Sequence, residues 1–144
     1  MKTLYTAVAT ASDAGRGGSA SSDDGRLEVQ LSVPSAMGGD DGPGTNPEQL
    51  FAAGYAACFS SAMGGSAARD GNPGAVEGSS VTAHVSIGPL GQGRFGLAVK
   101  LEVQLPALSQ ADAEALVALA HERCPYSNAT RGNVEVELDV TGGS

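Results

Sequence analysis

Two cysteines, Cys58 and Cys124, are the residues of this chain best suited to covalent chemistry. A thiolate is a nucleophile that a peroxide can oxidise to a sulfenic acid, and a second thiol can then trap that acid as a disulfide. Cys58 lies in a stretch rich in Ala and Gly, so we expect it deep in a buried helix, where burial raises the pKa of a thiol. A reactive Cys58 therefore needs a basic partner from elsewhere in the chain.

The segment before this first cysteine has the signals of a helix start. Asn46 can accept a hydrogen bond from the first-turn amides, and Pro47 suits the first helical position because it has no N–H to lose. Glu48 lies at the positive end of the helix dipole, and Gln49 follows Asn46 by three residues, as in a capping box. The residues up to about Ala68 are apolar on every side, which predicts a fully buried helix packed closely against another backbone.

The second cysteine lies near the other end of the chain, where it closes another helix. This helix is expected from Gln110 to about Arg123, with Ser109 as its N-terminal cap. Pro125, directly after Cys124, is expected to stop it. Each cysteine thus ends or interrupts a helix.

Alternation of apolar and polar residues predicts the strands that must surround these helices. The expected strands are residues 4–11, 27–33, 81–87, 95–105 and 134–140. We expect the first two to form a hairpin with a long, glycine-rich tip that carries Arg16. The resulting order β-β-α-β-β-α-β predicts one α+β domain over residues 1–144. Because so few strands cannot cover an all-apolar helix from every direction, we also expect a homodimer in which two copies of the Cys58 helix pack together.

Composition excludes several classes of function. The net charge of −8 argues against a nucleic-acid groove, which needs clustered Lys and Arg, and no apolar run is long enough for a membrane span. The N-terminal apolar region is short and threonine-rich, so we expect no signal peptide and a cytoplasmic protein. In that compartment a cysteine pair is more often catalytic, redox-active or metal-binding than a structural disulfide.

Two sequence motifs resemble one known family. Gly44-Thr-Asn-Pro-Glu-Gln-Leu-Phe51 followed by Cys58, together with Cys124-Pro-Tyr-Ser-Asn-Ala129, is similar to the organic hydroperoxide resistance (Ohr) branch of the Ohr/OsmC superfamily. The similarity extends over nearly the whole chain. It implies the Ohr/OsmC-like α+β fold and an intertwined homodimer, with central buried helices wrapped by sheets and active sites at the subunit interface.

The resemblance also implies a function and a set of catalytic residues. The family reduces organic hydroperoxides with Cys58 as the peroxidatic and Cys124 as the resolving cysteine, assisted by Arg16 and Glu48. The implied reductant is dihydrolipoamide or a lipoylated protein, and no metal, haem or flavin cofactor is implied. Arg16 is followed by Gly where the family pattern predicts an acidic residue, so Arg26 is the alternative arginine.

Helix geometry adds a prediction about Glu48. Ten positions separate it from Cys58, which places the two roughly 15 Å apart along the helix axis. At about 100° per residue they also point in directions about 80° apart. We therefore expect Glu48 to serve the site of the partner subunit and to orient the partner's Arg16.

Other functions remain open from the sequence. The pair could form a redox-sensing or binding module whose disulfide does not turn over, or the chain could belong to the OsmC branch. A structural metal-binding domain would need Cys58, Cys124, His84 and His121 to converge, although their spacing matches no zinc motif. His84 alone is expected in the core or on a sheet face.

Overall fold

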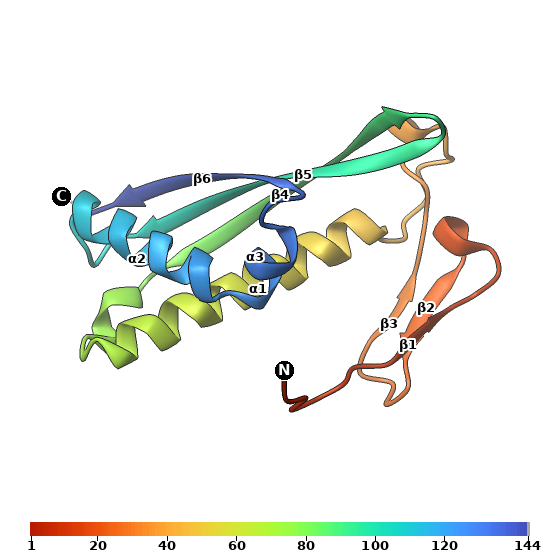
Figure 1. Ribbon diagram of the computed structural model, residues 1–144. Helices are drawn as coiled ribbons and strands as arrows, with labels where there is room; N and C mark the ends of the chain where they lie inside the picture. The colour runs from red at the N-terminus through yellow and green to blue at the C-terminus, as the bar shows by residue number, and fades with distance from the viewer. Residues whose placement is uncertain (144) are drawn as a thin grey trace. The chain divides into compact units, whose positions relative to one another are not determined.

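The chain divides into two compact units, each with its own three-stranded sheet. The computed structural model describes residues 1–143, and the units are Met1–Leu50 and the residues from Phe51 onward. The first sheet has the order β1-β2-β3 and the second β4-β5-β6 (Figure 1). Together with the helices, these sheets give the expected α+β fold. That the two units act as a single domain stays a prediction.

The first sheet is an antiparallel meander, which differs from the predicted hairpin. Its strands are β1 (Ala9–Ala11), β2 (Ser19–Ser22) and β3 (Glu28–Gln30). The hairpin prediction was wrong because β2 lies between the two expected strands; its sequence Ser-Ala-Ser-Ser has no apolar alternation to reveal it. The 3₁₀ helix η1 (Gly15–Gly17) connects β1 to β2 and carries Arg16, so this arginine does lie in a loop between strands.

The first expected strand is also shorter than predicted. Of residues 4–11, only β1 pairs with another strand, while the residues before it have no ladder partner within the described chain. The side chains of Leu4, Tyr5 and Val8 are exposed. The Val8 carbonyl accepts from the Asp23 amide at 3.0 Å, but residues 4–8 form no strand in the single chain. A strand needs a neighbour to pair its backbone groups.

The second sheet matches the predicted strands closely. β4 (Ser80–Gly91) and β5 (Arg94–Leu105) form a long antiparallel hairpin, and β6 (Glu135–Gly142) lies parallel to β5 at the edge. The hairpin turns at Gly91, Gln92 and Gly93, all with positive φ. The two glycines tolerate this conformation without steric cost.

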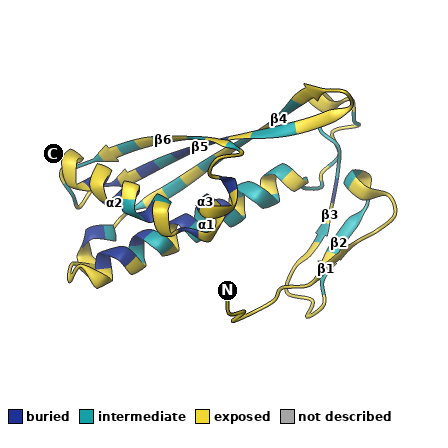
Figure 2. Ribbon diagram, viewed as in Figure 1, coloured by how far each residue is buried: buried dark blue, intermediate teal, exposed yellow. Residues whose placement is uncertain are grey.

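The register of this sheet separates an apolar face from a polar one. Val85, Val99 and Val136 lie side by side across β4, β5 and β6, and the rows next to them are likewise apolar. The opposite face carries charged side chains such as Lys100 and Glu137. β5, the central strand, contributes the buried residues (Figure 2): Val99, Leu101, Val103 and Leu105.

Three α-helices complete the chain: α1 (Pro47–Arg69), α2 (Gln110–Arg123) and α3 (Pro125–Thr130). Two further 3₁₀ helices, η2 (Ser35–Met37) and η3 (Pro73–Val76), lie in connections. α1 and α2 share one hydrophobic core with the apolar face of the second sheet. The N-terminal cap of α2 is confirmed, because the Ser109 hydroxyl accepts from the Asp112 amide at 3.2 Å.

The prediction that α1 is fully buried was wrong for the single chain. Tyr55, Phe59 and Met63 face the core, and the sheet and α2 cover only that side of the helix. The opposite side is exposed and consists almost entirely of small residues: Ala53, Ala57, Ser60, Ser61, Gly65 and Ala68. An exposed helix face made of small residues, without a charged side chain among them, is unusual for a free surface.

Candidate active site

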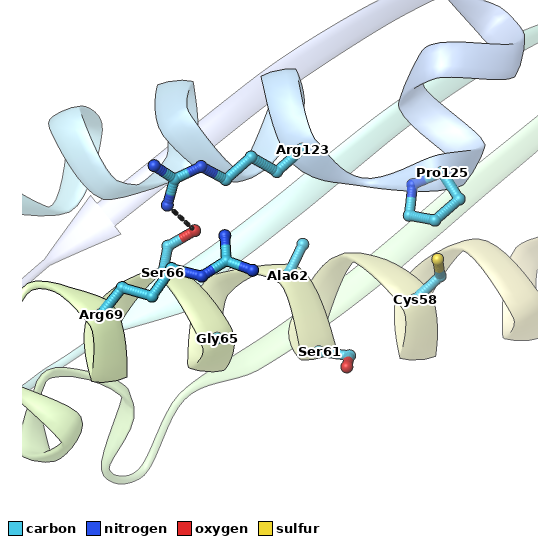
Figure 3. A pocket seen from close by; sticks show the side chains of 8 residues that line it. All are labelled: Cys58, Ser61, Ala62, Gly65, Ser66, Arg69, Arg123 and Pro125. Atoms are coloured by element: carbon cyan, nitrogen blue, oxygen red, sulfur yellow. Dashed lines mark hydrogen bonds between the residues drawn. The ribbon is translucent and has the colours of Figure 1, made fainter. Parts of the chain in front are cut away.

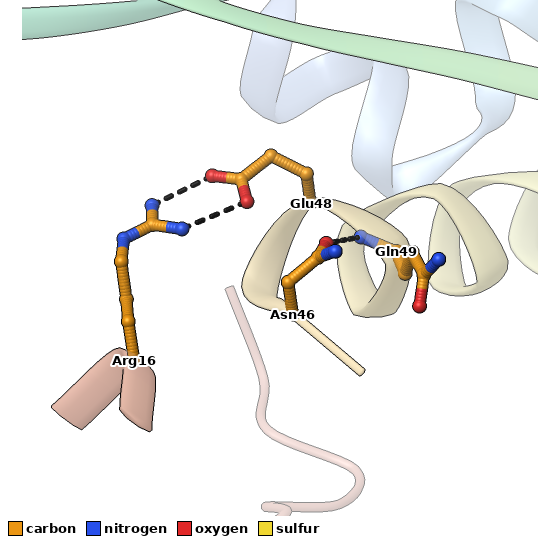
Figure 4. Close-up of polar contacts among 4 residues, drawn as sticks. All are labelled: Arg16, Asn46, Glu48 and Gln49. Carbon is orange, nitrogen blue, oxygen red and sulfur yellow. Dashed lines mark hydrogen bonds and ion pairs between the residues drawn. The ribbon is translucent and has the colours of Figure 1, made fainter. Parts of the chain in front are cut away.

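The first turn of α1 forms as its sequence predicts, with one difference. The Asn46 side chain accepts from the Gln49 amide at 2.8 Å, which confirms the N-terminal cap (Figure 4). The second half of the capping box does not form, because the Gln49 side chain instead accepts from the Thr45 hydroxyl at 2.6 Å. The Glu48 carboxylate, between these two residues, points away from the helix and is available for another partner.

That partner is Arg16. The guanidinium donates two hydrogen bonds to the Glu48 carboxylate, at 2.8 and 2.6 Å, in the bidentate geometry that fixes both groups (Figure 4). The side chains are 37% and 13% exposed. The hydrogen bonds raise the pKa of Arg16 and lower the pKa of Glu48. Both groups are therefore held in their charged forms.

The structure corrects one expectation about this pair and favours one arginine. Glu48 binds the Arg16 of its own chain, so the expected pairing with the partner's Arg16 was wrong. The pairing within one chain is possible because η1 and the start of α1 belong to the same unit. Arg26, the alternative, is 90% exposed and lies 3.7 Å from Asp24. Which subunit's Cys58 the pair serves stays a prediction.

The two cysteines, 66 positions apart in sequence, meet in the second unit. Their Sγ atoms are 3.6 Å apart, and both thiols are free. A disulfide requires an S–S distance of about 2.05 Å. The two sulfurs are therefore not bonded here, and after oxidation of one of them only a small approach would be needed for a disulfide.

The helix junction explains how Cys124 reaches α1. Cys124 ends α2 with an extended backbone (φ −65°, ψ 126°), and Pro125 both stops α2 and begins α3. The stop at Pro125 is thus confirmed, while α3 was not predicted. The turn places the Cys124 side chain fully inside the core, whereas Cys58 is only partly buried.

The surroundings of Cys58 raise the pKa of its thiol. Burial is the largest cause, and the neighbouring Cys124 raises the pKa further. The nearby backbone amide of Tyr126 acts in the opposite direction and lowers the pKa of Cys58. Tyr126 lies two residues after Cys124, in the first turn of α3, and this position brings its backbone amide near Cys58.

Gly54 makes room for this first turn of α3. A Cβ at position 54 would lie 2.5 Å from the Tyr126 hydroxyl and 3.1 Å from its Cζ. The Tyr126 ring packs instead against Phe51 and Tyr55, with centroid separations of 5.9 and 5.6 Å. A glycine at this position therefore lets α3 approach α1 one turn before Cys58.

Buried hydroxyl groups stabilise the junction between α2 and α3 where Cys124 lies. The Ser127 hydroxyl is hydrogen-bonded to the Tyr55 hydroxyl and to His121 Nδ1, both at 2.8 Å, and Thr130 lies 3.2 Å from Tyr55. Burial lowers the pKa of His121, and the charge of Arg131 lowers it further. Sequence reasoning did not find this set, which joins α1, α2 and α3 around Cys124.

A cavity of about 410 Å³ opens beside Cys58 (Figure 3). Its lining includes Ser66, Arg69 and Arg123, and it does not include Cys124. A helical period could have indicated part of this lining, because Arg69 follows Cys58 by eleven residues, or three turns, on the same side of α1. The cavity makes Cys58 the cysteine that a molecule from solution can reach.

The two histidines lie apart from each other, and neither belongs to a cluster of side chains that could bind a metal ion. His84 is on the exposed polar face of the second sheet, 3.2 Å from Glu102, as a sheet-face histidine would be. His121 is engaged with Ser127. Among residues 1–143 no group of three or more His, Cys, Asp or Glu side chains converges in a way that could hold a metal ion.

Comparison with known proteins identifies the family of this chain. The OsmC-like protein family matches residues 38–139. An organic hydroperoxide resistance protein of Xanthomonas axonopodis pv. citri is 52% identical over 141 residues, covering 96% of both chains. The chain belongs to the organic hydroperoxide resistance branch of the OsmC-like family. Within this branch, the Bacillus subtilis protein OhrB is 45% identical, covering 95% of this chain and 98% of its own.

Solved structures of the organic hydroperoxide resistance branch share the fold. The protein from Legionella pneumophila superposes with a TM-score of 0.91 at 48% identity, covering 97% of this chain and 99% of its own. The protein from Elizabethkingia anophelis gives a TM-score of 0.92 at 45% identity, covering 99% of both. The family and fold expected from the two motifs are thereby confirmed.

Proposed function

We propose that this protein is a cysteine-based peroxidase that reduces organic hydroperoxides to alcohols. The observation that carries the proposal is the Cys58–Cys124 pair, with sulfurs 3.6 Å apart and only Cys58 facing the cavity. The relatives' name, organic hydroperoxide resistance protein, supports a role in peroxide detoxification and the oxidative stress response. Cys58 is the peroxidatic residue in this proposal and the buried Cys124 the resolving one.

The reaction proceeds in three balanced steps. The Cys58 thiolate attacks one oxygen of the hydroperoxide; an S–O bond forms, the O–O bond breaks, and the alkoxide takes up a proton and leaves as an alcohol. The Cys124 sulfur then attacks the Cys58 sulfenic acid, so that an S–S bond forms and water leaves. Finally, an external dithiol reduces the disulfide by thiol exchange and becomes oxidised itself.

Arg16 and Glu48 have assigned roles in the first step. A thiol whose pKa is raised by burial needs a cation to hold it ionised, and the same cation stabilises the departing alkoxide. We assign this task to Arg16. Glu48 is the positioning residue, because its two hydrogen bonds fix the guanidinium plane.

The proposal also assigns a reductant and a compartment. We assign dihydrolipoamide or a lipoylated protein as the dithiol, on the family resemblance. A cysteine pair that cycles between dithiol and disulfide suits a reducing compartment, and we place the protein in the cytoplasm. Among residues 1–143 no helix combines the length and the hydropathy that crossing a bilayer requires.

A homodimer completes the proposal. The exposed face of small residues on α1 would let a second copy of this helix approach closely, and the exposed Leu4 and Tyr5 leave an extended segment without a partner. Both features are accounted for if two chains intertwine, with active sites at their interface.

The test is a single-turnover oxidation followed by peptide mapping. Reduced protein treated with one equivalent of a neutral alkyl hydroperoxide should lose two hydrogens and yield a Cys58–Cys124 crosslinked peptide. Cys58→Ser should not react, whereas Cys124→Ser should release one equivalent of alcohol and stop at the sulfenic acid. An unchanged mass of the wild type would contradict the peroxidase proposal.

The steady-state rate of hydroperoxide consumption distinguishes a peroxidase from a redox-sensing or binding module. With dihydrolipoamide in excess, a peroxidase consumes hydroperoxide continuously. A redox-sensing or binding module would form the disulfide once and turn over no further.

A further inference from the structure

We propose that Arg131 is a positioning residue for the second step of the reaction, in which Cys124 closes the disulfide with Cys58. Its side chain joins the end of α2 to α3 and thereby holds the backbone on either side of Cys124. This inference rests on the proposed peroxidase function and adds a residue to that same site.

Two hydrogen bonds connect the Arg131 guanidinium to residues that flank Cys124. One nitrogen donates to the backbone carbonyl of His121, in the last turn of α2, and the other donates to Asn128 Oδ1 in α3 at 2.7 Å. His121 lies three residues before Cys124 and Asn128 four residues after it. The Asn128 amide in turn donates to the Cys124 carbonyl at 2.9 Å. The guanidinium therefore holds both segments of the chain that meet at this cysteine.

The carbonyl of His121 requires a side-chain donor because of Pro125. In a continuous helix this carbonyl would accept from the amide of residue 125, four positions further on. Proline has no N–H, and α2 ends at Arg123, so the carbonyl is one of the end groups that a helix leaves without a partner. The Arg131 side chain supplies the donor, and its positive charge suits the negative end of the helix dipole.

The backbone of Arg131 is held in place as well as its side chain. Arg131 directly follows α3, and its amide donates to the Ser127 carbonyl at 2.9 Å. A planar guanidinium presents its donors in fixed directions and can therefore bind two acceptors at once. Its two bonds lie on the exposed side of the corner, whereas the Ser127 hydroxyl binds Tyr55 in the buried interior. The corner between α2 and α3 is thus held from both sides.

The position of this corner matters to the chemistry because Cys124 is fully buried. Its Sγ atom lies 3.6 Å from that of Cys58, and a disulfide needs about 2.05 Å. A closely packed side chain moves mainly with its own backbone. Misplacement by about 1 Å can slow an oriented reaction about 100-fold. A shift of the corner should therefore slow the step at Cys124, while the earlier attack of Cys58 on the hydroperoxide proceeds as before.

The sulfenic acid on Cys58 has two competing fates, and their ratio measures the second step. In the first, the Cys124 sulfur attacks the Cys58 sulfur; an S–S bond forms, the S–O bond breaks, and the hydroxyl leaves as water with the thiol proton. In the second, another hydroperoxide molecule transfers an oxygen; an S–O bond forms, the O–O bond breaks, and a sulfinic acid and an alcohol result. Only the second fate becomes faster with hydroperoxide concentration. The concentration that converts half of the protein to sulfinic acid therefore reports the rate of disulfide formation.

The test variants are Arg131→Gln and Arg131→Lys, with Arg94→Gln as the matched control. Arg94 is exposed at the start of β5, and its substitution makes the same change in net charge as Arg131→Gln. We expect Arg131→Gln to slow disulfide formation about 10-fold and to lower the half-conversion concentration by the same factor. Arg131→Lys keeps a charged donor for the His121 carbonyl and should recover part of the rate. Alcohol release in the first turnover should match the wild type in all three variants, and Arg94→Gln should also form the disulfide normally.

Quenched-flow mass analysis of disulfide, sulfinic acid and alcohol distinguishes the outcomes. Disulfide formation at the wild-type rate in Arg131→Gln would overturn the positioning role. Equal slowing of alcohol release and disulfide formation would overturn it too, because that result indicates a general loss of structure. If Arg131→Gln does not fold, Arg131→Lys and Asn128→Ala each lose one of the two bonds and should still slow disulfide formation alone. A wild type that releases no alcohol and keeps its mass would instead refute the peroxidase proposal.

Discussion

At the scale of single residues, the question is how a buried thiol becomes a nucleophile. Burial and the adjacent Cys124 both raise the pKa of Cys58, and the Tyr126 amide offsets them only in part. Hydrogen bonds to Glu48 raise the pKa of Arg16 and so favour its charged form. The proposed activation of Cys58 by Arg16 thus combines a permanent cation with a thiol that needs one.

Arg16→Ala should show this dependence directly. Without the cation, we expect the pKa of Cys58 to rise and the rate of hydroperoxide reduction at neutral pH to fall about 100-fold or more, as when a transition-state donor is removed. The rate should recover partly as pH increases, because more thiolate then forms. Thiolate absorbance and stopped-flow oxidation across pH measure the two effects. Arg26→Ala is the control and should behave as the wild type; equal losses in both variants would argue against the assignment.

Glu48→Gln tests the positioning role and its pH dependence. The ion pair lowers the pKa of Glu48, so its stabilisation is complete above the pKa of an unfolded glutamate and is lost as pH falls through the lower folded value. Because Arg16 is more than a third exposed and therefore screened by solvent, we expect the ion pair to contribute only about 1 kcal/mol to the free energy of unfolding. Thermal unfolding of wild type and variant should differ at neutral pH and converge in acid. A difference that persists below the folded pKa would have another cause.

At the scale of elements, the corner between α2 and α3 sets the distance between the two sulfurs. Cys124 lies at this corner, and Ser127 joins it to α1 through Tyr55 and to α2 through His121. All these groups are satisfied, and no side-chain N or O atom that is buried in the described chain lacks a partner. Hydrogen bonds therefore tie the corner to both neighbouring helices.

Ser127→Ala should loosen this corner. Removing the hydroxyl leaves the Tyr55 hydroxyl with Thr130 alone and His121 without its partner, which should cost about 1–3 kcal/mol of unfolding free energy. We also expect slower disulfide formation after Cys58 is oxidised, since Cys124 is held less firmly. Chemical denaturation and quenched-flow mass analysis measure the two effects. Ser86→Ala, on the exposed face of β4, should alter neither, and a variant as stable as wild type would show that the hydroxyl set is dispensable.

Elements with strong local signals were predictable from the sequence. The cap at Asn46, the stop at Pro125 and the strands of the second sheet depend on local chemistry and on alternation, and all are present. β2 was missed because its polar sequence forms a strand only through its neighbours, and α3 because a proline that ends one helix can begin another. Propensity does not contain such tertiary information.

In the candidate site, too, features with a local sequence signal were predictable, and features that depend on tertiary contacts were not. The two motifs identified both cysteines and Glu48, and the strand pattern placed Arg16 in a loop. Contacts between distant segments bring Arg16 to Glu48 of the same chain. Such contacts also place Arg69 and Arg123 in the lining of the Cys58 cavity. Sequence spacing could not supply these contacts.

At the scale of the whole molecule, α1 poses the problem that a second chain would solve. Its core face is filled by Tyr55, Phe59 and Met63, yet its other face is exposed and almost without polar side chains. Small residues on that face permit backbones to approach closely. In a monomer this surface would be left against water without charged groups to solvate it.

Ala57→Glu tests this dimer without altering the core face of α1. Ala57 lies opposite the buried side of the helix, so a carboxylate there would be desolvated against the second copy and should weaken association strongly. Analytical ultracentrifugation should show a dimer for wild type and a shift toward monomer for the variant. Ala118→Glu, on the exposed side of α2, adds the same charge and should leave the dimer intact. If both variants remain dimeric, the small-residue face of α1 is not the interface, and the exposed segment at Leu4 and Tyr5 becomes the surface to mutate next.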